Sequence, residues 1–192
     1  MRARASLAET IAKIDEESRR LFLETFHEVG EHFQRIFRQL FGGGKAEITL
    51  EDGVDVLEAG IEISARPPGR EMLPISLLSG GQRTMTALAL LFAVFQARPS
   101  PFCVLDEVDA ALDDANIDRF LGMLDDFRKS TQFIVVTHQK RTMEVAGMMY
   151  GVSMTKEGTS KVLAQRIDAP SAGSTPVDAG ATLVVPEPDA VR

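Results

Sequence analysis

A long helical pattern opens the chain. Apolar residues between positions 5 and 41 recur mostly at spacings of three and four, which places them along one face of a helix. The early part of this stretch, around Asp15 to Arg20, is thinner in apolar residues and rich in charge. A long amphipathic core helix would account for the pattern. For its N-terminal portion we favour the last turns of a coiled coil that runs into a globular domain. The apolar residues are Leu7, Ile11, Ile14, Leu21, Phe22, Phe26, Val29, Phe33, Ile36 and Leu40.

Short strands are predicted after this helix. Gly42-Gly43-Gly44 ends the helix, because glycine adopts the positive φ that often follows a helix. Polar and apolar residues alternate at 47–50 and at 60–64, the period of half-buried strands, with the turn signal Asp52-Gly53 between them. The proline-containing segment 66–70 is predicted to be a loop.

The middle of the chain alternates helices with apolar strands. The run Phe102–Leu105 follows a helix that ends near Gln96, and it predicts a strand covered on both faces. A helix at about 116–129 then leads to a similar run at 133–136. Strand, helix and strand in this order imply parallel pairing in an α/β domain. A short helix and two further strands are expected near 142–146, 150–154 and 162–165.

The composition changes after Asp168. Prolines scattered among Ala, Gly, Ser, Thr and Asp predict a disordered tail over 169–192. Leu183–Val185 could be a short docking motif within it, although chance explains three apolar residues better. The expected organisation is therefore a long helix at 1–41, an α/β lobe at 42–168 and the tail.

Composition restricts the class of protein. Of the 192 residues, 44% are hydrophobic, which indicates a globular protein. The formal net charge of -7 argues against a protein whose whole surface binds nucleic acid. Cys103 is the one cysteine, so neither an internal disulfide nor a cysteine metal cluster can form. No apolar run is long enough to span a bilayer, and the N-terminus lacks the pattern of a secretory signal. We expect a cytoplasmic protein.

Two motifs could contact a nucleotide directly. Leu78-Ser79-Gly80-Gly81-Gln82 opens a helix, where free backbone N–H groups, the helix dipole and the Ser79 hydroxyl can hold a phosphate; the alternative is a serine that only caps the helix. Asp106 and Glu107 follow an apolar strand, at the end where α/β sheets bind ligands. Asp106 is suited to hold Mg²⁺ through water, and Glu107 to polarise an attacking water; two carboxylates that cap the next helix are the alternative.

Two later residues are weaker candidates. Asp113 is most simply explained as the cap of the helix that starts near Asn116. His138 follows the second apolar strand and can donate a hydrogen bond to a phosphate oxygen, although a single histidine there is more often structural. His27 and His32, on the long helix, are read as ordinary residues. Asp106 lies 27 residues after Ser79 and His138 lies 32 after Asp106, which leaves room for one helix between each pair.

In this order the motifs resemble those of ABC-type ATPases, and among these the head of bacterial SMC (structural maintenance of chromosomes) proteins. Residues 78–82 resemble the signature motif, 103–107 the Walker B strand with its catalytic glutamate, Asp113 the D-loop and His138 the switch histidine. The runs 41–47, 60–69, 101–113, 131–138 and 150–154 are similar to SMC heads, and the resemblance covers roughly residues 20–168. Gln82, where many SMC proteins have Glu, and Gly147, where Asp is common, depart from the pattern.

The resemblance implies the C-terminal lobe of an SMC head. A phosphate-binding P-loop requires Gly-x-x-x-x-Gly-Lys-Ser/Thr, whereas Gly44-Lys45 is preceded by Gln39 at the first glycine position and followed by Ala46. The family's Walker A lobe lies at its N-terminus, so the chain would be a fragment, a split-gene product or a piece expressed alone, and is expected to be inactive by itself.

The resemblance also implies cofactors and partners. These are ATP and Mg²⁺, the N-terminal Walker A lobe, a second SMC head, a kleisin subunit and DNA, at the nucleoid and without a membrane. The implied function is ATP hydrolysis that drives head engagement in chromosome condensation and segregation. Two alternatives stay open: a non-hydrolysing lobe that binds a kleisin or DNA, and the lobe of a related DNA-repair ATPase or, less consistent with the long entry helix, of a transporter.

Overall fold

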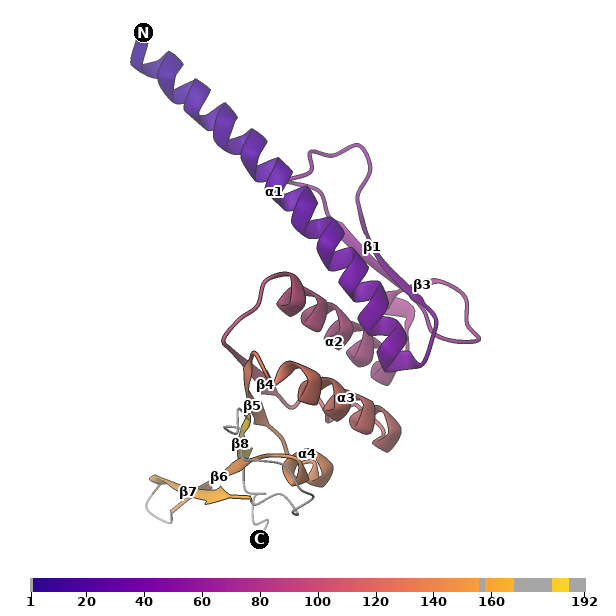
Figure 1. The fold of residues 1–192 in the computed structure, drawn as a ribbon, viewed down its shortest axis with the longest axis vertical. Helices are drawn as coiled ribbons and strands as arrows, with labels where there is room; N and C mark the ends of the chain where they lie inside the picture. Colours follow the sequence, from indigo (N-terminus) through magenta and orange to yellow (C-terminus); the bar gives the residue numbers. More distant parts are fainter. Residues whose placement is uncertain (1, 156–157, 168–180, 187–192) are drawn as a thin grey trace. The chain divides into compact units, whose positions relative to one another are not determined.

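The computed structural model describes residues 2–155, 158–167 and 181–186, which form two compact units. Unit 1 is Met1–Arg98 and unit 2 is Pro99–Arg192 (Figure 1). In the described part of the chain, no helix combines the length and the apolar character needed to cross a membrane. The architecture is mixed α/β, as predicted.

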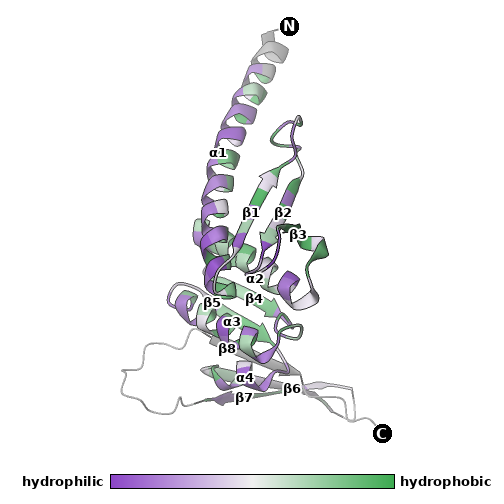
Figure 2. Cartoon of the chain, turned by 90° about the vertical axis from the view of Figure 1, so that its right-hand side faces the viewer, coloured by the Kyte–Doolittle hydropathy of each residue, from purple (hydrophilic) through white to green (hydrophobic). Residues whose placement is uncertain are grey.

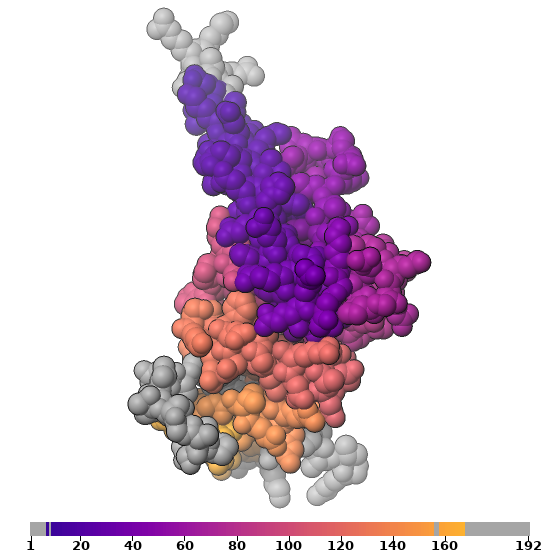
Figure 3. All heavy atoms as spheres, turned by 45° about the vertical axis from the view of Figure 1, so that its right-hand side comes forward, coloured from indigo at the N-terminus to yellow at the C-terminus, as the bar shows by residue number. Residues whose placement is uncertain are grey.

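Unit 1 is built around α1, Arg2–Phe41. The apolar face of this helix changes character along its length, because Phe33, Phe37 and Leu40 are buried whereas Leu7 and Ile11 are 62% and 51% exposed. In Figure 3 the N-terminal half of the helix (indigo) projects beyond the rest of its own unit. Among the described residues, the seam predicted from the sequence is thus buried toward its C-terminal end and exposed toward its N-terminal end.

A small sheet and a second helix pack with the end of α1. Strands β1 (Lys45–Leu50), β2 (Ile61–Arg66) and β3 (Leu73–Pro74) are antiparallel and ordered β1-β2-β3. The 3₁₀ turn η1 (Ile75–Leu77) leads into α2 (Gly80–Ala97), which lies beside α1 in Figure 1. Met85, Ala89 and Phe92 of α2 are completely buried, so this helix supplies much of the core of unit 1.

The turn between α1 and β1 requires glycine. Gly42, Gly43 and Gly44 all have positive φ, as the helix-ending role predicts. At Gly44, with φ +86°, an added Cβ would lie 2.3 Å from the carbonyl oxygen of Arg66. The glycine therefore allows the turn before β1 to approach the end of β2 closely.

Unit 2 has a five-stranded sheet ordered β4-β5-β8-β6-β7. Strands β4, β5, β8 and β6 pair in parallel, and β7 is antiparallel to β6. Helix α3 connects β4 to β5 and α4 connects β5 to β6, which is the expected strand–helix–strand order. The elements are β4 (Phe102–Asp106), α3 (Asp114–Phe127), β5 (Gln132–Val136), α4 (Lys140–Glu144), β6 (Met148–Met154), β7 (Ser160–Arg166) and β8 (Ala181–Pro186).

Strand β4 differs from its prediction. It is strongly hydrophobic in Figure 2, yet only alternate residues are buried: Cys103 and Leu105 are inside, whereas Phe102 and Val104 are 59% and 56% exposed. The expectation of cover on both faces was therefore wrong for this chain. An apolar strand pattern indicates what both faces prefer to contact, and within the described part of the chain one face of β4 stays exposed.

The tail also differs from its prediction. Residues 181–186, expected to be disordered, form β8 between two strands of the sheet. Composition misled the prediction because even a short, mostly apolar segment can gain backbone hydrogen bonds on both sides when two strand edges are available. The rest of the predicted tail, 169–180 and 187–192, lies outside the described residues.

Candidate functional site

The carboxyl ends of β4 and β5 bring together three of the residues singled out in the sequence. Parallel pairing sets Asp106 opposite Val136, and the Glu107 N–H donates to the Val136 carbonyl at 2.9 Å. His138 follows Val136 by two residues, so it emerges at the same edge. The predicted Asp106, Glu107 and His138 therefore line one rim of unit 2.

Glu107 has an unusual backbone. Its φ of 49° makes it the one non-glycine residue with positive φ in the described part of the chain. A non-glycine residue in this region is disfavoured, and such strain is commonly found where a side chain must be aimed at a ligand. The conformation directs Glu107 Oε1 to 4.0 Å from His138 Nδ1.

The gap between Glu107 and His138 is open to solvent. Both side chains are 57% exposed, and 4.0 Å is too long for a direct hydrogen bond. A water molecule or a phosphate oxygen on the solvent side of the pair can contact both a carboxylate that accepts a proton and an imidazole that donates one. The rim can therefore present two polar groups to the same reacting water.

A buried aspartate holds this rim from behind. Asp109 is completely buried, and its Oδ2 accepts hydrogen bonds from the hydroxyls of Thr137 at 2.6 Å and Thr142 at 2.5 Å. The Thr137 hydroxyl also accepts from the Gln139 N–H at 2.9 Å. Asp109 thereby ties the segment after β4 to the segment after β5 and to α4, on both sides of His138. We call Asp109, Thr137 and Thr142 the threonine clamp.

Sequence reasoning gave the clamp no role. Asp109 lies in an acidic run, where a solvated carboxylate is the ordinary expectation, and neither threonine had a distinctive spacing. The useful signal was Asp109's place between two apolar residues, Val108 and Ala110, shortly after the β4 strand.

Asp113 caps a helix, as its simplest reading predicted. Its Oδ1 accepts a hydrogen bond from the Asn116 N–H at 2.9 Å at the start of α3. This places Asp113 on the exposed segment that leaves the rim, and a further contact with a nucleotide or a second chain is compatible with the cap.

The Ser79–Gln82 motif begins α2 in unit 1. Ser79 is the N-cap, and its N–H donates to Gln82 Oε1 at 3.4 Å. Ser79 and Gly80 are exposed, and an added Cβ at Gly80 would meet nothing within 4 Å, so the end of the helix is accessible. Arg83, which the sequence reasoning missed, donates to the carbonyls of Ser76 and Leu78 at 2.8 and 3.3 Å and fixes the preceding loop. A cation and free helix N–H groups at one accessible end suit an anion.

The donor set at the rim suits Mg²⁺ only together with a phosphate. Among the described residues, no cluster of three or more His, Cys, Asp or Glu side chains could hold a metal alone. Mg²⁺ in nucleotide sites is bound by one or two carboxylates, with water and phosphate completing the octahedron. Asp106 provides one exposed carboxylate at the correct edge of the sheet, which fits this mode of binding.

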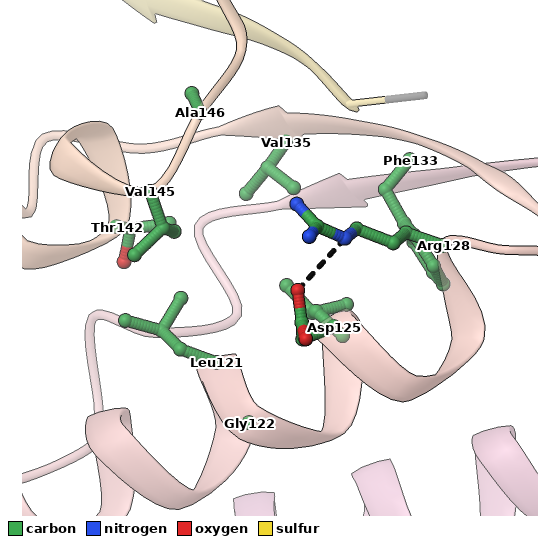
Figure 4. A pocket seen from close by; sticks show the side chains of 10 residues that line it. Leu121, Gly122, Asp125, Arg128, Phe133, Val135, Thr142, Val145 and Ala146 are labelled. Atoms are coloured by element: carbon green, nitrogen blue, oxygen red, sulfur yellow. Dashed lines mark ion pairs between the residues drawn. The ribbon is translucent and has the colours of Figure 1, made fainter. Parts of the chain in front are cut away.

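A separate pocket lies away from the rim. Its volume is 320 Å³, and it is lined by residues of α3, β5 and α4, with the Asp125–Arg128 ion pair at one side (Figure 4). Phe133 and Val135, on β5, also line it. None of the predicted site residues lines it, whereas Thr142 of the threonine clamp does.

Comparisons with known proteins give a consistent result. The family model described as "RecF/RecN/SMC N terminal domain" matches residues 4–161. The chain is 49% identical over 166 residues to the chromosome partition protein Smc of Bacillus subtilis, and the match covers 86% of this chain and 14% of that protein. A chromosome partition protein Smc from Rhodopirellula baltica is 52% identical, with the same coverage. The chain thus spans about one seventh of the length of these curated relatives.

Solved structures agree with the sequence matches. The Smc head domain of Pyrococcus furiosus, solved with an extended coiled coil and bound to the C-terminal domain of ScpA, is 39% identical with a TM-score of 0.73, over 84% of this chain and 40% of that one. A chain solved in work on ATP-driven dimerization and DNA-stimulated activation of SMC ATPases is 38% identical with a TM-score of 0.69, over 77% and 89%.

Proposed function

The chain belongs to the family of SMC ATPase heads that act in chromosome partitioning, and from this membership we propose that it is the C-terminal half of such a head. In this proposal it completes an ATP site with an N-terminal Walker A lobe, and hydrolysis controls the engagement of two heads. The matching family model is named for an N-terminal domain, so the assignment to the C-terminal half depends on the chain's own residues.

One observation carries the proposal: Glu107 and His138 face each other across 4.0 Å at the carboxyl edge of parallel strands. We assign Glu107 to accept a proton from the attacking water, and His138 to donate a hydrogen bond to a phosphate oxygen. Asp106 would hold Mg²⁺ through water. The bound ion would neutralise charge on the phosphates.

The cradle for the triphosphate must come from another segment. The printed sequence has no Gly-x-x-x-x-Gly-Lys-Ser/Thr, and its one similar site, Gly44-Lys45, is a turn in which Gly44 packs against the carbonyl of Arg66. In this proposal the chain supplies catalytic carboxylates and another segment supplies the loop that grips ATP. This division is what a C-terminal half requires.

The accessible end of α2 has a different task in this proposal. Ser79, Gly80, Gly81 and Gln82 would bind the γ-phosphate of a nucleotide held by a second head, with Asp113 near the interface as the D-loop. ATP would then join two heads, and loss of the γ-phosphate would release them. The helix dipole and the exposed Ser79 hydroxyl favour such an anion.

The remaining partners are proposed from the relatives and from α1. The exposed apolar residues Leu7, Ile11 and Ile14 fit a second coiled-coil helix. The ScpA-bound head from Pyrococcus furiosus supports a kleisin partner for this lobe, and the study of DNA-stimulated SMC ATPases supports action on DNA at the nucleoid.

Reconstitution tests the proposal. The chain alone should not hydrolyse ATP, and addition of the N-terminal head segment of the Bacillus subtilis Smc protein should restore turnover. Glu107→Gln should then reduce turnover by about 100-fold or more while ATP stays bound and heads stay paired. Glu144→Gln, an exposed substitution of the same kind on α4, should leave turnover unchanged.

Two results would contradict the assignment. Turnover by the isolated chain that Glu107→Gln abolishes would show that no second lobe is needed. Binding of the N-terminal segment without turnover would favour the non-hydrolysing module instead.

A further inference from the structure

The middle of the sheet in unit 2 is filled by the last strand of the chain. Strand β8 pairs in parallel with β5 from Phe133↔Ala181 to Val136↔Val184, and with β6 from Met148↔Thr182 to Val152↔Pro186. In Figure 1 its label lies between those of β5 and β6. Without β8 these two strands would stand about 10 Å apart, twice the strand spacing, with unpaired backbone groups facing one another. We call this gap, bounded by Phe133–Val136 and Met148–Val152, the acceptor slot.

The connection to β8 allows it to leave and return. The end of β7 and the start of β8 lie at the same edge of the sheet, because Arg166 and Thr182 both pair with Met148. The chain has to step over only one strand, a lateral distance of about 10 Å. From Ile167 to Ala181 there are 14 residue steps (181 − 167), with a maximum reach of about 46 Å. Departure of β8 therefore requires no rearrangement of β4 to β7.

Under the proposed function, on which this step rests, the acceptor slot lies where the missing phosphate-binding loop has to meet the sheet. A P-loop follows the carboxyl end of a parallel strand and precedes a helix. To bring phosphate to Glu107 and His138, that strand must lie next to β4 or β5. The candidate positions are the outer edge of β4 and the acceptor slot, where Val184 already pairs with Val136, two residues before His138.

The slot is the stronger of the two positions. A strand at the edge of β4 gains one ladder of backbone hydrogen bonds, whereas a strand in the slot gains two, one with β5 and one with β6. The helix that follows a P-loop would also need an apolar surface, and Phe102 and Val104 expose one on β4. Two ladders and an uncovered apolar face together fit a strand–loop–helix segment.

We propose that β8 is a placeholder that the chain's own tail inserts into the acceptor slot, and that the strand preceding the P-loop of the N-terminal lobe displaces it when the head assembles. In the separate chain, β8 protects the facing edges of β5 and β6 from pairing with other chains. The tail consequently competes with the lobe. Assembly is an exchange of one parallel strand for another.

Hydrogen–deuterium exchange on the full chain tests the exchange of strands. In the chain alone, the amides of 181–185 and of both slot strands should be protected, Pro186 having no amide proton. Addition of the N-terminal head segment of the Bacillus subtilis Smc protein should remove protection from 181–186 while Phe133–Val136 and Met148–Val152 stay protected. This measurement requires no variant.

A proline variant gives the quantitative test. Val184→Pro should weaken β8, because proline cannot donate to a ladder inside a sheet. The added segment should then bind about tenfold more tightly, equivalent to about 1.4 kcal/mol of competing pairing. Val191→Pro, five positions beyond the last residue of β8, is the matched control and should leave the affinity unchanged. Deletion of 169–192 should strengthen binding in the same direction.

The outcomes separate the two proposals. If the segment binds and restores ATP turnover while 181–186 keep their protection, the placeholder is refuted and the proposed function stands. Equal affinity for Val184→Pro and Val191→Pro would also refute the placeholder. If neither the chain nor its deletion variant gains turnover with the segment, the proposed function itself fails.

Discussion

Loss of the Asp109 carboxylate should destabilise unit 2 far more than loss of an exposed one. In Asp109→Ala the hydroxyls of Thr137 and Thr142, both buried, lose their shared acceptor. Among the described contacts, neither hydroxyl donates another hydrogen bond. Because both threonines are buried, water does not replace the lost carboxylate. The segment that carries His138 would then be held by fewer contacts.

The expected cost follows from the contacts. Two hydrogen bonds to a carboxylate contribute about 1.5–3 kcal/mol each, or about 3–6 together. Asp109 Oδ1 is buried and accepts no hydrogen bond among the described residues. Its removal offsets about 1–3 kcal/mol of this loss, because the folded state no longer bears the cost of desolvating that atom. The net destabilisation should be about 3 kcal/mol. Asp109→Asn keeps one acceptor oxygen and should cost about 1 kcal/mol.

Tyrosine fluorescence during urea unfolding measures this cost. Tyr150 is the one tyrosine, the chain has no tryptophan, and Tyr150 lies on β6 of unit 2. With a slope of about 2 kcal/mol per molar urea, Asp109→Ala should move the midpoint down by about 1.5 M. The control Asp114→Ala, whose side chain is 81% exposed, should cost below about 1 kcal/mol. If the two variants unfold within 0.3 M of each other, roughly the error of such measurements, the clamp does not stabilise unit 2.

Three further predictions concern other parts of the chain. Gly44→Ala should lower the thermal midpoint by circular dichroism well beyond Gly42→Ala, because its Cβ would overlap the Arg66 carbonyl at 2.3 Å whereas at Gly42 nothing lies within 4 Å; equal shifts would contradict the close approach. Burial raises the pKa of the Cys103 thiol, so a thiol reagent should label it slowly in the folded chain and rapidly in urea. The thiol ionises at a lower pH in the unfolded chain than in the folded one, so the stability of the folded chain should decline as the pH rises above the ordinary thiol pKa. A urea midpoint that stays constant up to about pH 10, beyond that ordinary pKa, would contradict this. Asp113→Ala should cost about 1 kcal/mol through loss of the α3 cap, measured against Asp113→Asn, which retains it.

Local patterns were sufficient for most elements. The helix predicted at about 5–41 is α1, Arg2–Phe41, because a repeat of three and four residues specifies which face can be buried. The apolar runs at 102–105 and 133–136 became parallel neighbours, since a strand–helix–strand order leaves little alternative. That pairing in turn placed Glu107 and His138 at one edge.

The seam of α1 shows the limit of such patterns. Periodicity identified the apolar face but not its partner, and Leu7 and Ile14 are 62% and 58% exposed where Phe33 and Phe37 are buried. Hydrophobic spacing states a preference for contact. Which surface meets that preference is decided elsewhere in the fold or in another chain.

The sequence by itself determined the helices, the parallel strand pair and the types of side chain at the rim, because each depends on residues close together in the chain. Only the tertiary structure decided that 181–186 enter the sheet between β5 and β6, since strand pairing depends on which edges are left unpaired, not on the strand's own composition. The tertiary structure also brought together the threonine clamp, whose hydrogen bonds join residues 28 and 33 positions apart. Burial without water gives those bonds their strength, and burial is a property of the whole fold.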